Sequence, residues 1–319
     1  MTLAQVSGYG GRYHRPMATG RPTANSAAPT SALTNTLQLG VPPEPWPTLG
    51  LGTWRFGESE RKASDEVSAI RRALEIGYRL FDTAEMYGDG GAERVLGRAL
   101  HDAMQHDQGL RREQLRIVSK AYPHHADVAG LQRACDASRK RLQLDTIDLY
   151  LLHWRGNVPL ADTLRGFEQL LSKGWIRRWG VSNFDVADLE ELRALDGGAA
   201  CAANQVYYSI SERGVEFDLL SRMRQWQMPL MAYTPIDSGR IGQHAELAAL
   251  AADLQVSPTQ LALAWLLHQP GVMAIPKAGR EAHLLENWRA QAQPLAPATL
   301  SALDTMFPKP KRKRPLAMR

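Results

Sequence analysis

The chain of 319 residues has little cysteine and no long apolar run. Its two cysteines, Cys135 and Cys201, lie far apart, and neither belongs to a CxxC pair or to a cluster of metal-ligand residues. Such thiols are typical of a reduced, cytoplasmic protein, and we expect no metal site. No apolar stretch approaches the length of a membrane-spanning helix, so we expect a soluble protein without a membrane partner.

A glycine-rich phosphate loop is also absent. The nearest candidate is FDTAEMYGDGG at residues 81–91, which fits neither the dinucleotide-binding fingerprint nor the P-loop spacing. Asp and Gly are common in turns, so the simplest interpretation is a strand end that runs into a turn. That interpretation leaves open why Asp82 and Tyr87 stand together at this point.

Acidic residues are missing before Glu44, so both ends of the chain are basic. Of the 38 Lys and Arg, nine lie in residues 1–43 and in the tail KPKRKRPLAMR, which starts at Lys309. The body at 44–308 contains the other 29 basic residues and all 33 acidic residues, so its net charge is near −4. A short charge run is usually solvated, and we expect no nucleic-acid partner.

Residues 1–43 are rich in Gly, Pro, Ser, Thr and Ala and contain no apolar core of a secretory signal. This composition predicts a disordered basic extension. A transit peptide has a similar composition, and an upstream start codon would explain the segment equally well. The sequence therefore predicts an extension at 1–43, a single folded domain at 44–308 and a basic tail at 309–319.

Short apolar runs alternate with amphipathic segments from residue 49 onwards. Eight such pairs occur, from LGLGT with SDEVSAIRRALEIG to VMAIPK with REAHLLENWRAQ. Strands separated by helices of this length indicate a parallel sheet. Eight repeats in about 260 residues fit a (β/α)8 barrel better than a doubly wound sheet. We therefore predict an α/β protein with the TIM-barrel fold.

Some segments fall outside this alternation. PTQLALAWLLHQ, between the seventh and eighth pairs, and APATLSALDTMF, after the last pair, are predicted as extra helices packed outside the barrel. Before the first strand, LTNTLQLG and VPPEPWPTLG predict a hairpin that closes the barrel floor, although prolines are unfavourable in strands.

In such barrels the active site lies at the carboxyl ends of the strands. Taken singly, His153 could be a core histidine, Lys120 a rim charge and Asp82 a helix cap. Taken together with Tyr87, on the loop that leaves Asp82, they bring four titratable groups to one face. The strand ends form a polar, titratable and aromatic ring: Thr53, Trp54, Asp82, Lys120, His153, Ser182, Asn183, Gln205, Tyr233 and Lys277.

This ring suggests a proton donor aimed at a carbonyl group. Tyrosine is a poor acid at neutral pH, because its pKa is near 10 unless a neighbouring cation lowers it. We expect Lys120 to supply that cation, Asp82 to keep Lys120 charged and His153 to orient a substrate carbonyl. Such a donor complements a cofactor that delivers a hydride.

The motifs around these residues resemble the aldo-keto reductases over residues 45–308. LGLGTW, GYRLFDTAEMYG, IVSKAYP, DLYLLHW, GWIRRWGVSN, NQVYY and IPKAGREAHLLEN stand in the family's order and spacing. The resemblance implies an oxidoreductase with the catalytic tetrad Asp82, Tyr87, Lys120 and His153, in which Tyr87 is the general acid. It is strongest to bacterial reductases of methylglyoxal and other 2-oxoaldehydes, which implies small aldehydes as substrates and a monomer.

The same resemblance implies NADPH as the cofactor. Four strand-end residues would hold or stack on the nicotinamide: Ser182, Asn183, Gln205 and Tyr233. The adenosine end would lie over residues 277–287, with the 2′-phosphate near Lys277 and the adenine near Glu286 and Asn287. Thr53, Arg280 and His283 complete the expected cofactor set.

Two departures from the family pattern concern cofactor binding. His283 stands where the family has an arginine, which narrows the expected preference for NADPH over NADH. The segment after Tyr233, TPIDSGRIGQHAEL, is short, so we expect no long belt over the cofactor and fast cofactor exchange.

Aromatic residues after the strands are expected to wall the substrate pocket: Trp54, Phe56, Tyr122 and Trp154. Such a slot suits small aldehydes. Only a short basic tail follows the last helix, and the absence of a large loop there predicts broad specificity.

Two other functions remain open from the sequence. Lys120 could form a Schiff base in an aldolase-like lyase, although the acid Asp82 would keep the amine protonated. The protein could also be a non-catalytic NADPH-binding subunit, although all four tetrad residues are present.

Overall fold

The computed structural model describes residues 35–107 and 109–319. Most of the expected extension therefore lies outside the described residues. Its end does not, because β1 (Thr36–Leu39) pairs antiparallel with β2 (Glu44–Pro47). The predicted floor hairpin is confirmed, and the folded part begins earlier than residue 44.

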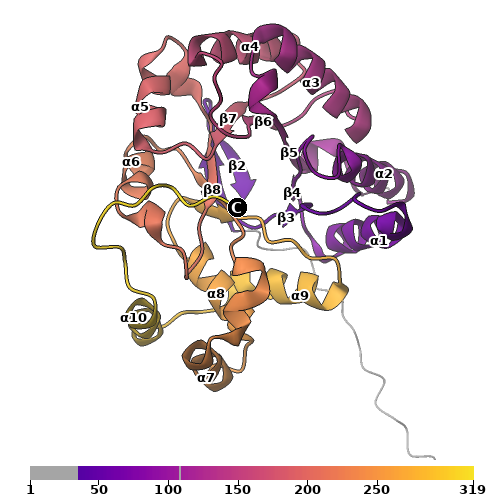
Figure 1. Ribbon diagram of the computed structural model, residues 1–319. Coiled ribbons are helices and arrows are strands. Elements are labelled where there is room, and N and C mark those ends of the chain that lie inside the picture. The colour runs from indigo at the N-terminus through magenta and orange to yellow at the C-terminus, as the bar shows by residue number, and fades with distance from the viewer. Residues whose placement is uncertain (1–34, 108) are drawn as a thin grey trace, which may run out of the picture. The chain divides into compact units, whose positions relative to one another are not determined.

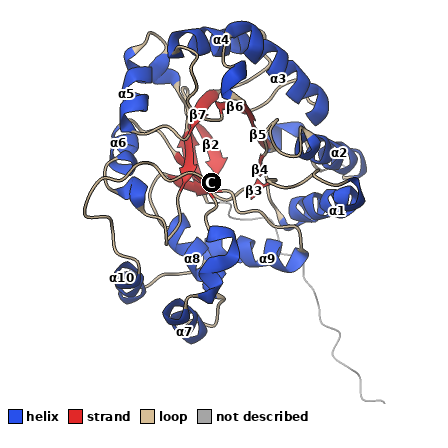
Figure 2. Cartoon of the chain, viewed as in Figure 1, coloured by secondary structure: helices blue, strands red, loops and turns tan. Residues whose placement is uncertain are grey.

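Eight parallel strands follow in chain order within one sheet, and two short bridges, Leu49 with Ala274 and Gly52 with Lys277, join its first and last strands. Helices surround the strands (Figures 1 and 2). The predicted (β/α)8 barrel is confirmed. Its strands are β3 (Leu51–Gly52), β4 (Leu80–Asp82), β5 (Arg116–Ala121), β6 (Leu149–Leu152), β7 (Trp179–Ser182), β8 (Asn204–Tyr207), β9 (Leu230–Tyr233) and β10 (Val272–Ala274).

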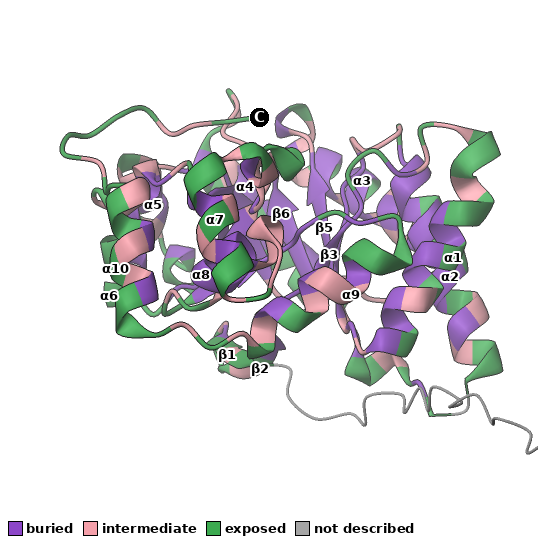
Figure 3. Cartoon of the chain, turned by 90° about the horizontal axis from the view of Figure 1, so that it is seen from below, coloured by how far each residue is buried: buried purple, intermediate pink, exposed green. Residues whose placement is uncertain are grey.

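Two hydrophobic clusters hold the barrel together. One fills the space between strands and helices, and the other fills the barrel interior, where Leu39 and Trp46 of the hairpin are fully buried. Figure 3 shows the hairpin at one end of the barrel and the C-terminus at the other. The hairpin thus plugs the floor, and the opposite mouth stays available for a site.

The helices follow the predicted order, with one correction. The structure places α8 (Pro258–Leu267), predicted as an extra helix, directly against β10, where six of its residues are buried. The helix before it, α7 (Ala245–Asp253), has only two buried residues and packs outside, against α8 and α10 (Pro297–Met306). The sequence pattern did not show which of the two helices packs on the barrel, because α7 and α8 are both apolar. The other helices are α1 (Glu60–Ile76), α2 (Gly91–His106), α3 (Val128–Leu142), α4 (Leu160–Ser172), α5 (Val186–Ala194), α6 (Leu219–Gln225) and α9 (Glu281–Arg289).

None of the helices formed by the described residues combines the length and the apolarity that crossing a membrane requires.

Candidate active site

Strand alternation places the candidate catalytic residues inside the barrel. Successive side chains of a strand point to opposite faces. On β5, Val118 belongs to the interior cluster, whereas Ile117 and Ala121 belong to the cluster under the helices. Lys120 therefore shares the inward face with Val118, and it is completely buried. The same alternation turns Asp82 inward with Leu80.

Tyr87 reaches the site from the loop between β4 and α2, and glycines shape that loop. Gly88 has a positive φ of 58°, which glycine adopts without strain. A Cβ atom on Gly91 would lie 2.3 Å from the carbonyl oxygen of Gly57, so the loop after β3 packs directly on this turn. The glycines of FDTAEMYGDGG thus serve the close packing that presents Tyr87.

Lys120 is the centre of the candidate catalytic cluster. Its Nζ donates hydrogen bonds to Asp82 Oδ2 at 2.8 Å, to the carbonyl oxygen of Thr83 at 2.9 Å and to Tyr87 Oη at 3.1 Å. The other carboxylate oxygen of Asp82 accepts a hydrogen bond from Gln205 at 2.7 Å. The predicted grouping of Asp82, Tyr87 and Lys120 is therefore present in the structure.

His153 completes this cluster as a neutral ring. Its ring lies edge-on to that of Tyr87, with 5.8 Å between the centroids. Burial, assisted by the positive charge of Lys120, lowers the pKa of His153 to about 2. A neutral imidazole can donate one N–H to a carbonyl oxygen without carrying charge into the site.

The pKa of Tyr87 differs from the sequence-based expectation, because it is raised and not lowered. Burial raises the pKa of Tyr87, and the nearby Lys120 offsets only part of that increase. Burial lowers the pKa of Lys120, but Asp82 and Tyr87 outweigh it, so the net direction is upward. The prediction that Lys120 brings the pKa of Tyr87 below its ordinary value is wrong, because burial outweighs the effect of Lys120. Lys120 instead limits the increase that burial causes.

A second polar group lies beside the tetrad. Asn183, with a left-handed φ of 60°, accepts a hydrogen bond from Tyr233 Oη at 2.9 Å and donates one to the carbonyl oxygen of His153 at 3.1 Å. Ser182 Oγ donates to the carbonyl oxygen of Gln205 at 2.8 Å. Four predicted residues at the ends of β7, β8 and β9 are thus held together next to the candidate catalytic cluster.

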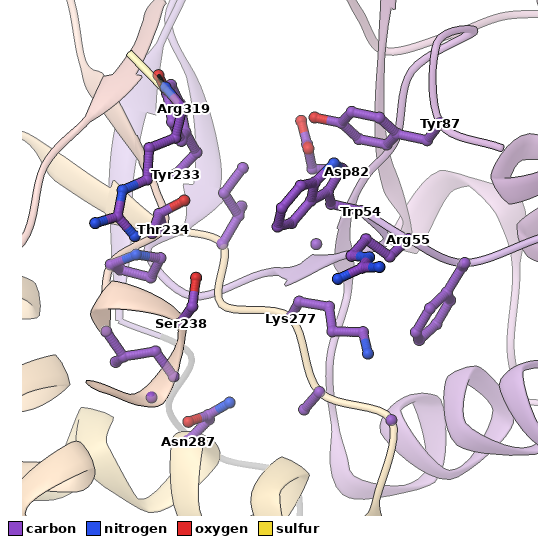
Figure 4. A pocket seen from close by; sticks show the side chains of 18 of the residues that line it. Trp54, Arg55, Asp82, Tyr87, Tyr233, Thr234, Ser238, Lys277, Asn287 and Arg319 are labelled. Carbon is purple, nitrogen blue, oxygen red and sulfur yellow. Dashed lines mark hydrogen bonds between the residues drawn. The ribbon is translucent and has the colours of Figure 1, made fainter. Parts of the chain in front are cut away.

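A cavity of about 950 Å³ runs from the tetrad to the amino end of α9. Asp82, Tyr87 and Trp54 lie at one end of it, and Lys277 and Asn287 lie at the other (Figure 4). Arg280 and His283 also line the second end. Lys277 Nζ lies 5.1 Å from the ring centroid of Phe56, and partial burial lowers its pKa.

Several predicted site residues are placed elsewhere. Thr53 is fully buried and does not line the cavity. Its hydroxyl group donates a hydrogen bond to the carbonyl oxygen of Asp82. Glu286 interacts with Ser257 and His283 instead. Tyr122 and Trp154 pack against each other outside the cavity lining, with ring centroids 6.0 Å apart.

Phe56 does line the cavity, and its ring lies under the Nζ of Lys277. The sequence showed only that Phe56 follows a strand, and the left-handed turn at Arg55, with φ of 66°, redirects the chain after Trp54.

Two cavity-lining arginines were not predicted as site residues. Arg55 directly follows Trp54, so its place at a strand end was a usable signal. Arg319 comes from the basic tail, and nothing in the sequence pattern connected it to the site.

Comparison with known proteins agrees with this geometry. Residues 48–307 match the Aldo/keto reductase family. The chain is 45% identical over 277 residues to the methylglyoxal reductase YeaE of Escherichia coli (strain K12), an alignment covering 85% of this chain and 95% of that protein. It is 35% identical over 243 residues to the glyoxal reductase of Bacillus subtilis (strain 168), covering 76% and 82%.

A similar solved structure is the aldo/keto reductase of Klebsiella pneumoniae in complex with NADP and acetate. The TM-score is 0.85 and the identity 41%, and the match covers 90% of this chain and all of that one. The resemblance predicted from the sequence is confirmed, and this chain belongs to the aldo/keto reductase family.

Proposed function

We propose that this protein reduces small aldehydes and 2-oxoaldehydes to alcohols with NADPH as the hydride donor. The observation that carries the proposal is the buried cluster in which Lys120 Nζ joins Asp82 and Tyr87 at one end of the 950 Å³ cavity. Further support comes from the methylglyoxal and glyoxal reductases among the relatives and from the NADP-bound structure from Klebsiella pneumoniae.

The residues along the cavity fit a dinucleotide phosphate. The cavity volume lies near the upper end of the range for ligand pockets. Polar groups of Ser182, Asn183 and Gln205 lie where a carboxamide can bond, and the ring of Tyr233 offers a stacking surface. At the other end, Lys277 and Arg280 supply the positive charge that a 2′-phosphate requires.

The proposed proton transfer starts at Tyr87. NADPH, when bound, supplies the hydride that adds to the carbonyl carbon. Tyr87 Oη gives its proton to the carbonyl oxygen, and the ammonium of Lys120, 3.1 Å away, stabilises the resulting phenolate. Asp82 holds Lys120 in place, and neutral His153 orients the carbonyl oxygen. A proton from water then restores Tyr87.

The Schiff-base alternative is disfavoured by the contacts of Lys120. Its Nζ donates three hydrogen bonds and its pKa is raised, so the amine is protonated and is not a nucleophile. Borohydride trapping with a ketone should therefore leave Lys120 unmodified, and a covalent adduct there would overturn the reductase proposal.

A direct test follows NADPH absorbance, and separately NADH absorbance, with methylglyoxal, phenylglyoxal, 4-nitrobenzaldehyde and an aldose. Wild type should consume NADPH with the aldehydes, and Tyr87→Phe should turn over at least about 10²-fold more slowly. Turnover of Tyr87→Phe at the wild-type rate would refute this mechanism. Tight NADPH binding without oxidation by any aldehyde would instead support the non-catalytic subunit.

We further propose a cytoplasmic monomer. Both thiols are buried, and burial raises the pKa of each to about 12, which suits persistent reduced cysteines. Light scattering coupled to gel filtration should give the mass of one chain, and a dimer mass would contradict the monomer.

A further inference from the structure

Residues 308–319 cross the mouth of the barrel instead of extending into solvent. They leave α10 without forming a helix or strand, and Figures 1 and 3 show their end above the barrel centre, opposite the floor hairpin. We call residues 308–319 the strap.

Acidic residues at the mouth anchor the strap. Lys313 Nζ lies 3.0 Å from Asp218 Oδ2, and Arg319 Nη1 lies 3.0 Å from Asp237 Oδ1. Leu316 packs on the hydrophobic core between these two ion pairs. The sequence suggested that the basic residues of the tail are solvated. In the structure, two of them instead fix the course of the strap across the barrel mouth.

Arg319 is the part of the strap that enters the cofactor site. Its backbone N–H lies 3.4 Å from Tyr233 Oη, and its guanidinium lies 5.1 Å from the ring centroid of Tyr207. Tyr207 in turn stacks on Tyr233, with 5.9 Å between the ring centroids. Arg319 lies beside Tyr233 and Thr234 on one wall of the cavity (Figure 4).

That wall carries unfavourable backbone conformations. Thr234, Asp237 and Ser238 all have positive φ values, of 50°, 51° and 55°. Non-glycine residues in this region cost about 1–3 kcal/mol each and persist only where other contacts hold them. The Asp237 carboxylate is one such contact, because Oδ1 accepts hydrogen bonds from Tyr207 and Arg240 and pairs with Arg319.

We propose that the Arg319–Asp237 ion pair is a latch that keeps the strap over the cavity and slows the release of NADPH. The inference rests on the proposed function, since it takes the cavity to be the NADPH site. Arg319 acts as a positioning residue: it ties the strap to the wall that carries Tyr233, and the latch must open before the ligand leaves. The latch predicts slower exchange than we expected from the short segment after Tyr233 alone, and the release rate decides between the two predictions.

The test measures the rate of NADPH release without substrate, by stopped-flow displacement with excess NADP and detection of protein fluorescence. Arg319→Ala should release NADPH about three- to fivefold faster than wild type, the upper part of the range for an exposed ion pair. Raising the ionic strength should accelerate release from wild type more than from Arg319→Ala, because salt screens the pair.

Arg240→Ala is the matched control. Arg240 Nη2 donates a hydrogen bond to the same oxygen of Asp237, Oδ1, at 2.8 Å, and the substitution removes this contact. Arg240 belongs neither to the strap nor to the cavity lining. Its release rate should stay within about twofold of wild type. A chain ending at Phe307 should release NADPH at least as fast as Arg319→Ala.

The outcomes separate the two proposals. NADPH binding to wild type with equal release rates in wild type, Arg319→Ala and Arg240→Ala would overturn the latch and leave the proposed function standing. Equal acceleration by both arginine variants would also overturn it, because the effect would then come from Asp237 alone. Failure of wild type to bind NADPH would refute the proposed function and the latch together.

Discussion

Two lysines at the barrel mouth show how differently the two ends of the cavity are built. Lys120 is fully buried, makes three hydrogen bonds and has a raised pKa. The side chain of Lys277 lines the cavity, makes no hydrogen bond or ion pair with any described residue, and has a pKa lowered by partial burial. The difference suggests that one end is organised before the ligand arrives, whereas the other keeps its charge available for the ligand.

This contrast has a physical reason. A proton donor must be held at a fixed position relative to the reacting atom, and a low-dielectric surrounding strengthens its interaction with a fixed cation. A phosphate group can bind to mobile, hydrated cations that form their hydrogen bonds only with the ligand. The following predictions test this division, starting with the largest expected effect.

Lys120→Met should damage both catalysis and folding. The substitution leaves the buried Asp82 carboxylate with Gln205 as its remaining side-chain partner. We expect turnover to fall by about 10²–10⁴-fold and the free energy of unfolding to fall by about 3–5 kcal/mol. Urea denaturation and NADPH oxidation measure the two effects.

The exposed Lys140, paired with Asp136, provides a control. Lys140→Met should change the free energy of unfolding by about 0.5 kcal/mol or less. Similar losses in both variants would remove the distinction between a structural lysine and a surface lysine.

Lys277→Met should change cofactor choice rather than stability. We expect NADPH affinity to fall about 10- to 100-fold, since a charged hydrogen bond to a phosphate is lost, while NADH affinity stays within about twofold. Fluorescence titration of both cofactors measures the ratio. Equal losses for NADPH and NADH would show that Lys277 does not meet the 2′-phosphate.

His283→Arg supplies the opposite change at the same end of the cavity. Since His283 stands where the family has arginine, this variant should bind NADPH several-fold more tightly and NADH unchanged. Unaltered NADPH affinity would indicate that His283 lies too far from the phosphate to contribute.

His153 should make stability depend on pH. Its pKa falls from 6.5 to about 2 in the folded protein, so the unfolded chain takes up the proton first as the pH falls. The associated stability is present above pH 6.5 and is lost below it, by about 1.6 kcal/mol between pH 6.5 and 5. His153→Gln should lose correspondingly less over that interval in urea denaturation.

An exposed histidine provides the comparison for this experiment. His101→Gln should retain the pH dependence of wild type. If His153→Gln loses as much stability as wild type between pH 6.5 and 5, the histidine is not held neutral by burial.

Local pattern was sufficient to predict the barrel and to place Asp82, Lys120 and His153 at one end of it, whereas their catalytic roles and that of Tyr87 were predicted from the resemblance to the family. The repeat of strands and helices predicted a barrel whose strand ends meet at one mouth, and Asp82, Lys120 and His153 each lie at or next to the end of a strand. The cluster around Asn183 and Gln205 followed from the same rule, combined with the resemblance to the family.

Long-range contacts could not be predicted in this way. Arg319 reaches Asp237 across 82 positions without any periodic signal, because only the path of the strap brings them together. Whether α7 or α8 packs directly on β10 depends on the three-dimensional path of the chain, because both helices are apolar. The direction of the Tyr87 pKa shift could not be predicted, because it depends on how deeply the side chain is buried, and the sequence does not show this.

The most direct test measures two quantities on the same two variants: turnover at saturating NADPH, and the NADPH dissociation constant. Tyr87→Phe should lower turnover by at least about 10²-fold and change the dissociation constant by less than about twofold. Lys277→Met should weaken binding by about 10-fold or more and leave turnover at saturation within about threefold of wild type. If each variant changes both quantities to a similar extent, the division between a preorganised catalytic end and a ligand-organised binding end is contradicted.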